Sequence, residues 1–230
     1  MKTENISIQN IPALLIGEQS DKAYLYIHGK MGQKEEALDF APIAVQMGYQ
    51  VLAIDLPQHG ERILSDEKLV PWEVIPEIKT VYEFMLSNWQ SISLRATSIG
   101  AWFSMLALSD FDINKALFVS PIVNMQNLIE NMIMWANVSE EQLKQQGEIP
   151  TSFGETLSWD YLCWVRDNPI KWTAPTEILY AENDNLTAKN VLCDFAKLHS
   201  TGVTVMQNGE HWFHTKEQLD FLRRWECKFI

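Results

Sequence analysis

The sequence contains few cysteines, and none of them is placed for a disulfide framework or a metal site. Cys163, Cys193 and Cys227 form no CxxC pair and have no histidine or cysteine at ligand spacing. Neither a stapled secreted fold nor a zinc site is therefore expected. We expect all three to be reduced thiols in a cytosolic protein.

Long apolar runs are also absent. The longest apolar stretches, such as 116–119, are far shorter than the about 20 residues that a membrane-spanning helix needs. The polar start MKTENISIQN has no apolar segment of the kind found in secretory signals. The sequence alone therefore predicts a cytoplasmic protein without a membrane span.

Basic residues are in the minority. Lys and Arg total 18 against 30 Asp and Glu, which gives a formal net charge of −12. Such a charge repels nucleic-acid phosphates and anionic lipid surfaces. We therefore expect a small-molecule substrate as the partner, and neither nucleic acid nor membrane. No metal or other cofactor is indicated, and the oligomeric state is left open.

The 230 residues are 47% hydrophobic, enough for one domain with one substantial core over residues 1–230. Short apolar runs alternate with helical patterns, which indicates an α/β fold with a mostly parallel central sheet and helices on both faces. Strands are expected within 6–16 (an edge hairpin) and at 23–27, 50–56, 92–97, 115–119, 177–180 and 203–206. Helices are expected at 33–47, 72–88, 99–108, 187–199 and from about 215 onward.

One segment interrupts this alternation. Between Pro121 and Pro175 the pattern shows no strand, only helical pieces rich in Met and Trp. These pieces lie at 127–135, 140–146 and 156–165. Because the segment is too long for a simple crossover, we expect a helical cap inserted at 122–174.

Three tryptophans of this segment, Trp135, Trp159 and Trp164, are candidate substrate-binding residues. A roof lined by Trp and Met would suit an apolar or aromatic group of modest size. For any single one of these tryptophans, packing of the cap onto the body is the favoured explanation. No cluster of arginines indicates a phosphate or coenzyme A handle.

Ser98 is the candidate nucleophile because it lies between an apolar strand and an apolar helix. A serine in so sharp a turn adopts a strained backbone that lifts its hydroxyl above the sheet. The positions two before and two after it must be small, as Ala96 and Gly100 are. The N–H groups and dipole of the following helix favour a developing negative charge.

A serine nucleophile needs a base, and the base needs a carboxylate to orient it. Asp184 lies just beyond the predicted strand at 177–180, and His211 just beyond the one at 203–206. The carboxyl ends of the strands in an open α/β sheet are where sites form. The chain order Ser, acid, His therefore predicts a catalytic triad.

Each assignment has a rival. Glu182 lies two residues before Asp184 and could take its place as the acid, although Asp184 is favoured. His214 competes with His211, but its position beside the start of the last helix suits a helix-terminus role. Ser98 could also be an ordinary buried serine.

Taken together, these motifs resemble the α/β-hydrolase superfamily over nearly the whole chain. His28-Gly-Lys-Met-Gly32 is similar to its oxyanion loop, and Asp55-Leu-Pro-Gln-His-Gly60 to its turn after the next strand. The segment 96–100 resembles the nucleophile elbow, with Ala96 in place of the commoner glycine. Asp184 and His211 fall where the superfamily keeps its acid and base.

The resemblance implies a role for each residue. Ser98 would be the nucleophile, His211 the general base and then acid, and Asp184 the group that fixes the His tautomer. The backbone N–H groups of Lys30 and Ile99 would form the oxyanion hole.

Three side chains around this loop are expected to play supporting parts. His28 is interpreted as a structural donor that shapes the oxyanion loop. His59 is expected to close the turn after Asp55, and the Lys30 ammonium to lie in solvent.

Two hypotheses for the function follow. The first is a carboxylic-ester hydrolase that works through an acyl-enzyme, with thioester, small-peptide and carbon–carbon bond hydrolysis open to the same triad. The second is a ligand-binding or sensor protein on a hydrolase fold with slow turnover.

Overall fold

An eight-stranded sheet forms the centre of the structure, a computed structural model that describes residues 1–230. Its strand order is β1-β2-β4-β3-β5-β6-β9-β10. The strands are β1 (Thr3–Ile8), β2 (Ile11–Ile16), β3 (Lys22–Ile27), β4 (Gln50–Ile54), β5 (Ser91–Thr97), β6 (Ala116–Val119), β9 (Thr176–Asn183) and β10 (Gly202–Glu210). From β4 to β10 all neighbours are parallel, and β1 and β2 form an antiparallel edge hairpin.

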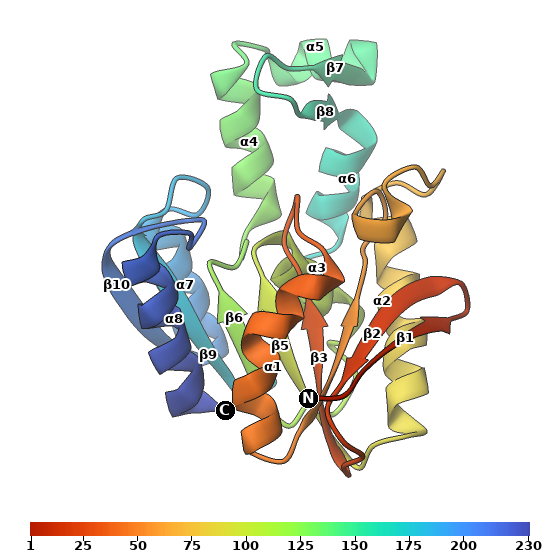
Figure 1. The fold of residues 1–230 in the computed structure, drawn as a ribbon. Coiled ribbons are helices and arrows are strands. Elements are labelled where there is room, and N and C mark those ends of the chain that lie inside the picture. Colours follow the sequence, from red (N-terminus) through yellow and green to blue (C-terminus); the bar gives the residue numbers. More distant parts are fainter.

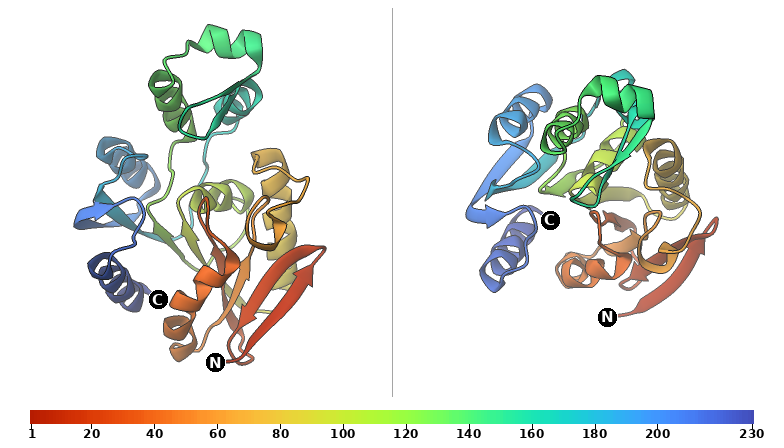
Figure 2. Two further views of the ribbon diagram at one scale, coloured as in Figure 1. Left: turned by 45° about the horizontal axis from the view of Figure 1, so that its top comes forward. Right: turned by 90° about the horizontal axis from the view of Figure 1, so that it is seen from above.

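Helices cover both faces of the sheet, as Figures 1 and 2 show. α1 (Ala37–Gln46) and α8 (Lys216–Phe229) pack on one face, where they share a core cluster of 17 buried residues. α2 (Pro71–Leu86), α3 (Ile99–Ala107) and α7 (Lys189–His199) pack on the other face, in a cluster of 42. The predicted α/β fold with a mostly parallel sheet is confirmed.

The two clusters explain why the inner strands are apolar without alternation. In β3, Ala23, Leu25 and Ile27 face the larger cluster, whereas Tyr24 and Tyr26 face the smaller one. A strand covered on both faces buries every side chain, so its sequence shows a continuous apolar run.

The segment 122–174, here called the cap segment, lies above the carboxyl ends of the strands (Figure 1). It contains α4 (Met125–Trp135), α5 (Glu140–Gln146) and α6 (Trp159–Asp167). It also contains an antiparallel pair, β7 (Glu148–Pro150) and β8 (Thr156–Ser158).

The expectation of no strand in this segment is therefore wrong. β7 and β8 have three residues each, too few for a period-two pattern to show in the sequence. The helix expected at 156–165 begins instead at Trp159. Ser158 caps it, because the hydroxyl accepts a hydrogen bond from the Tyr161 N–H.

Elsewhere the predicted elements are present, with small differences in their bounds and one helix divided in two. The helix expected at 33–47 divides into a 3-10 turn, η1 (Lys34–Glu36), and α1, which continues through Pro42. A second 3-10 turn, η2 (Gly60–Arg62), follows β4. The capping box that predicts the start of α8 is present, with Thr215 and Gln218 bonded reciprocally.

Candidate active site

The turn that carries Ser98 has a strained backbone. Ser98 joins β5 to α3 with φ of 51° and ψ of −121°, a conformation that residues other than glycine rarely adopt. Its N–H donates to the Val119 carbonyl at 3.0 Å, and its carbonyl accepts from the Ile122 N–H at 3.2 Å. The end of β6 and the loop after it therefore hold the strained turn on both sides.

A hydrogen-bonded chain joins Ser98, His211 and Asp184. The Ser98 Oγ lies 2.9 Å from Nε2 of His211, and Nδ1 of His211 lies 2.8 Å from Oδ2 of Asp184. With Nδ1–H donated to the carboxylate, Nε2 is left as the acceptor for the serine proton. The three side chains thus have the geometry of a nucleophile, a base and an orienting acid.

Asp184 is held by more than the histidine. Its side chain has no exposed surface, so each oxygen needs a donor. Oδ1 accepts from the N–H groups of Leu186 and Thr187 at 2.8 and 2.9 Å, which leaves Oδ2 for His211. The loop after β9 therefore fixes the carboxylate before the imidazole contacts it.

The two alternative residues, Glu182 and His214, lie outside this hydrogen-bonded chain of side chains. Glu182 accepts a hydrogen bond from the Asn208 N–H at 2.9 Å, where it links β9 to β10. His214 donates to the Trp212 carbonyl and stacks on the Trp212 ring. Neither side chain is hydrogen-bonded to Ser98.

The loop after β3 approaches the nucleophile closely. A Cβ on Gly29 would stand 3.3 Å from the Ser98 Cβ. A Cβ on Gly100 would stand 2.3 Å from the His28 carbonyl oxygen. The absence of side chains at these two positions therefore sets the distance between the loop and the nucleophile turn.

Two backbone N–H groups remain free beside this contact. The Lys30 N–H has no acceptor in the protein, and Ile99 is the first residue of α3, ahead of any carbonyl that could pair with it. Donors of this kind at a helix N-terminus suit an oxygen that gains negative charge.

Two neutral imidazoles hold the loop in place. His28 donates from Nδ1 to the Gly29 carbonyl at 2.7 Å and accepts at Nε2 from the Leu56 N–H at 3.1 Å. His59 accepts at Nε2 from the Met31 N–H at 2.9 Å. His28 thus shapes the loop as predicted, and His59 contacts the loop in addition to its own turn.

A buried ion pair between Lys34 and Asp55 joins the end of this loop to the turn after β4. Asp55 accepts from both the backbone N–H and the ammonium of Lys34, each at 2.8 Å. Burial alone would lower the pKa of Lys34, but hydrogen bonds to Asp55, Glu61 and Glu35 raise it. Gly60 has φ of 52°, and a Cβ there would collide with the Asp55 carboxylate.

Burial lowers the pKa of His28 to about 4, although the Gly29 carbonyl opposes this shift. The imidazole is therefore neutral near pH 7. Only the neutral ring has an Nε2 lone pair to accept the Leu56 N–H. The position of the loop after β3 thus depends on an uncharged histidine.

Comparison with known proteins finds likeness in structure but not in sequence. No protein-family model matches the chain, and no curated protein matches it. Solved structures match over nearly the whole chain. Est1E from Butyrivibrio proteoclasticus, solved with ferulic acid bound, has 18% identity over 98% of this chain and 97% of its own, with a TM-score of 0.74.

Two further structures give the same result. A putative hydrolase from Agrobacterium vitis S4 has 15% identity over 97% of both chains, with a TM-score of 0.76. Alpha/beta hydrolase domain-containing protein 10 from mouse has 11% identity over 99% of this chain and 96% of its own, also at 0.76. This chain has the α/β-hydrolase fold.

The three tryptophans predicted to bind substrate have different surroundings in the cap segment. Trp164 packs edge-on against Trp102, four residues after Ser98, with ring centroids 6.2 Å apart. Trp159 carries the Lys144 ammonium over its ring. Trp135 is 49% exposed and packs on the cap residue Phe153, so of the three only Trp164 packs against an aromatic ring of the body.

Two aromatic residues were missed by the sequence analysis. Tyr161 of α6 stacks on Trp102 of α3 with ring centroids 6.0 Å apart, and its ring centroid also lies 6.1 Å from that of Trp72. The Tyr161 hydroxyl is buried without a partner, and its burial raises its pKa. Trp102 lies one turn after Ser98, a spacing that could have drawn attention to it.

The Lys30 side chain is exposed, as expected, and also contacts the cap segment. It is 44% exposed, and its ammonium pairs with Glu155, in the turn between β7 and β8. Lys30 therefore has a free backbone N–H beside Ser98 and a side chain that contacts the cap segment.

No helix in the structure combines the length and the apolar character needed to cross a membrane.

Proposed function

We propose that this chain is a serine hydrolase that cleaves carboxylic esters through an acyl-enzyme on Ser98. The observation that carries the proposal is the hydrogen-bonded chain from Asp184 through His211 to Ser98. The likeness to Est1E and to an esterase of Pyrococcus furiosus supports it at the level of fold.

The first half of the reaction forms the acyl-enzyme. As Ser98 attacks the ester carbonyl, Nε2 of His211 takes the hydroxyl proton, and the imidazolium stays paired with Asp184. The carbonyl oxygen gains negative charge and accepts from the N–H groups of Lys30 and Ile99. His211 then gives its proton to the leaving alcohol.

The second half repeats these steps with water. His211 deprotonates the water that attacks the acyl carbonyl, and returns the proton to Ser98 as the acid leaves. Removal of one oxyanion-hole donor from a hydrolase typically raises the barrier by about 3–4 kcal/mol.

The substrate is proposed to be a small to medium, largely apolar ester. The aromatic residues Trp102, Tyr161 and Trp164 join the cap segment to the helix that begins at the nucleophile. A ring or alkyl group that enters between them would replace aromatic contacts with similar ones.

The test is covalent labelling with a fluorophosphonate, followed by intact-mass analysis. Wild-type protein should gain one adduct, and Ser98→Ala should gain none. The Ser120→Ala variant is the matched control, because this serine also follows a strand and is buried. Absence of an adduct on wild type would sink the proposal.

A panel of matched esters, thioesters and amides with one acyl group then identifies the bond. The ester should give the highest kcat/KM. If turnover is negligible for all three while a compound still raises the melting temperature of wild type and Ser98→Ala, the ligand-binding alternative holds.

A further inference from the structure

A single polar contact ties the main part of the cap segment to the rest of the chain. Between residues 123 and 171, only Glu155 forms a hydrogen bond or ion pair with a residue outside the cap segment, and its partner is the Lys30 ammonium. The aromatic rings of the cap segment also pack on Trp102. Apolar packing has no preferred direction, whereas a hydrogen-bonded ion pair has one. The Lys30–Glu155 pair is therefore the contact that favours one orientation of the cap segment on the body.

Lys30, the partner on the body, makes no other polar contact. Its backbone N–H lies free beside Ser98, and its carbonyl accepts no hydrogen bond within the protein. The residues on either side are tethered by histidines, through the Gly29 carbonyl and the Met31 N–H. Because the Lys30 peptide group lies between these two tethers, the contact through its side chain bears directly on where its N–H points.

Glu155, the partner on the cap segment, is held in place by its own turn. Its N–H donates to the Thr151 hydroxyl at 3.2 Å, and its carbonyl accepts from the Thr151 hydroxyl and N–H at 2.7 and 2.8 Å. β8 follows directly and ends at Ser158, which caps α6. Since α6 packs on Trp102, the unit that covers the helix of the nucleophile also places the Glu155 carboxylate.

The pair is exposed, so it contributes little to stability. The side chain of Lys30 is 44% exposed and that of Glu155 is 39% exposed. Exposed ion pairs change a folding equilibrium by about fivefold or less. A misplacement of about 1 Å at a reacting centre, by contrast, can lower a rate by about 100-fold. Loss of the pair should therefore leave the fold intact and act on position alone.

We propose that Glu155 is a positioning residue of the proposed ester hydrolase. By holding the Lys30 side chain, it directs the Lys30 backbone N–H toward the oxygen that gains charge when Ser98 attacks the ester. In this role Glu155 acts through Lys30 and needs no contact with the substrate. The role rests on the proposed function, because it requires an oxyanion at Ser98. It makes ester cleavage depend on the orientation of the cap segment, which carries Glu155 with it.

Steady-state kinetics with one neutral aryl ester test this role. Glu155→Gln should lower kcat about three- to tenfold and change KM little, because the Lys30 N–H meets a charge that develops only as the reaction proceeds. Glu148→Gln is the matched control and should keep the kcat of wild type. It removes the same charge from the same hairpin, but Glu148 is exposed and pairs with no cation.

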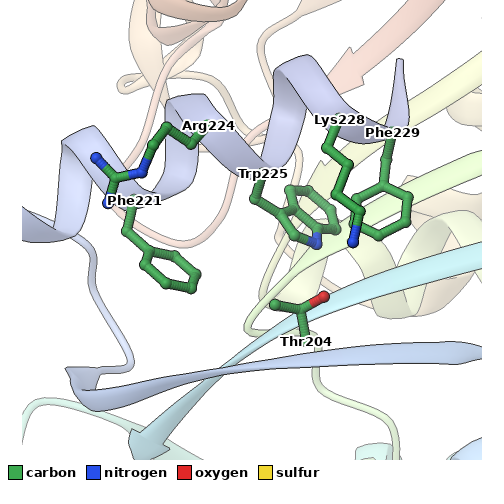
Figure 3. Close-up of a pocket in the computed structure, with 6 residues that line it drawn as sticks. All are labelled: Thr204, Phe221, Arg224, Trp225, Lys228 and Phe229. Atoms are coloured by element: carbon green, nitrogen blue, oxygen red, sulfur yellow. The ribbon is translucent and has the colours of Figure 1, made fainter.

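A double-mutant cycle shows whether the effect passes through Lys30. Lys30→Met keeps the backbone N–H and removes the ammonium, so Glu155→Gln should have no further effect on kcat in that background. Lys30→Glu/Glu155→Lys should recover most of the wild-type kcat, because it restores the pair with the charges exchanged. Lys228→Met is the control for loss of a lysine charge. Lys228 lines a pocket between α8 and β10, at the other end of the fold from the cap segment (Figures 1 and 3), so this variant should behave like wild type.

Fluorophosphonate labelling separates this proposal from the proposed function. If wild type takes no adduct on Ser98, the hydrolase and the role of Glu155 fall together. If wild type is labelled and cleaves the ester, the role of Glu155 alone is overturned by any of three results. Glu155→Gln keeps the kcat of wild type, it changes KM alone, or it lowers kcat as much in the Lys30→Met background.

Urea unfolding of each variant completes the test. Every variant should unfold at close to the urea concentration of wild type, so that a lower kcat reflects position and not loss of folded protein. A large loss of stability in Glu155→Gln would make the pair structural and would also overturn the proposal.

Discussion

Gly100 is a single residue on which the contact between two loops depends. We expect Gly100→Ala to lose about 1–3 kcal/mol of unfolding free energy, because its Cβ would meet the His28 carbonyl oxygen at 2.3 Å and backbone there cannot yield cheaply. Ester turnover should fall with it, as the oxyanion loop moves away from Ser98. Urea unfolding and kcat measured on the same preparation check both effects.

Gly29→Ala is the informative comparison for that variant. Its Cβ meets the Ser98 Cβ at 3.3 Å, a tight contact without overlap. We expect a smaller loss of stability and a clear loss of kcat. Equal losses of stability in the two variants would contradict the geometry.

Asp184 has a carboxylate that two backbone N–H groups and one imidazole share. We expect Asp184→Asn to keep the fold and lower kcat by on the order of 10⁴, because an amide no longer holds His211 in the tautomer that accepts the serine proton. Glu182→Gln is the control, since it retains an acceptor for Asn208 and should leave kcat near wild type. A reversed result would make Glu182 the acid.

The lowered pKa of His28 predicts that the free energy of unfolding depends on pH. Its pKa in the folded protein is about 4 against an ordinary value of 6.5, so the unfolded chain takes up a proton first as the pH falls. The contribution of His28 to the free energy of unfolding is fully present above about pH 6.5. It is lost as the pH falls toward about 4, by on the order of 3 kcal/mol in all. Urea unfolding across this range should show a steeper decline for wild type than for His28→Gln, which cannot titrate.

At the scale of elements, a buried ion pair connects α8 to β5, the strand that precedes Ser98. Arg95 Nε of β5 donates to Glu226 of α8 at 2.8 Å, and Arg95 also bonds Thr97, next to Ser98. Both side chains are buried. Burial raises the pKa of Glu226, although the Arg95 charge opposes this shift.

Removal of one member of this pair leaves the other uncompensated. We expect Glu226→Gln to cost about 3–5 kcal/mol of unfolding free energy, measured by urea denaturation, whereas Arg95→Met/Glu226→Leu should recover much of that loss. Arg223→Gln on the same helix is exposed and should change little. A loss below about 1 kcal/mol for Glu226→Gln would mean that water reaches the pair.

Individual helices and strands show which sequence patterns predicted the secondary structure and which did not. The continuous apolar run at 23–27 predicted a strand covered on both faces, and both core clusters use it. The capping box at Thr215 located the start of α8 to the residue. β7 and β8 escaped prediction because each has only three residues, and their pairing depends on contacts within the cap segment.

The site was predictable to the extent that local sequence determines it. Ser98, Asp184 and His211 each follow a strand, so their positions along the chain indicated a meeting at one sheet edge. The stack of Tyr161 on Trp102 and the pairing of Lys30 with Glu155 join segments more than 50 residues apart. No local pattern records such contacts, because tertiary packing alone brings these side chains together.

At the scale of the whole molecule, the net charge of −12 acts on any charged substrate. We expect kcat/KM for an ester with a carboxylate on its leaving group to rise severalfold from about 0.01 M to about 1 M salt, over which the Debye length falls from about 30 to about 3 Å. A neutral ester of the same acyl group should show little change. A fall with salt for the anionic ester would indicate a local positive field at the site.

Arg95 and Glu226 form an ion pair in the fold but lie 131 residues apart along the chain. This separation has a consequence for the order in which the two residues are synthesised. In a chain made from residue 1 onward, Arg95 and Ser98 are in place well before their partners. His211, the proposed base, follows 113 residues after the serine, and Glu226 follows 131 residues after Arg95. Until those residues have been made, the proposed nucleophile has no proton acceptor and its strand carries an unpaired guanidinium.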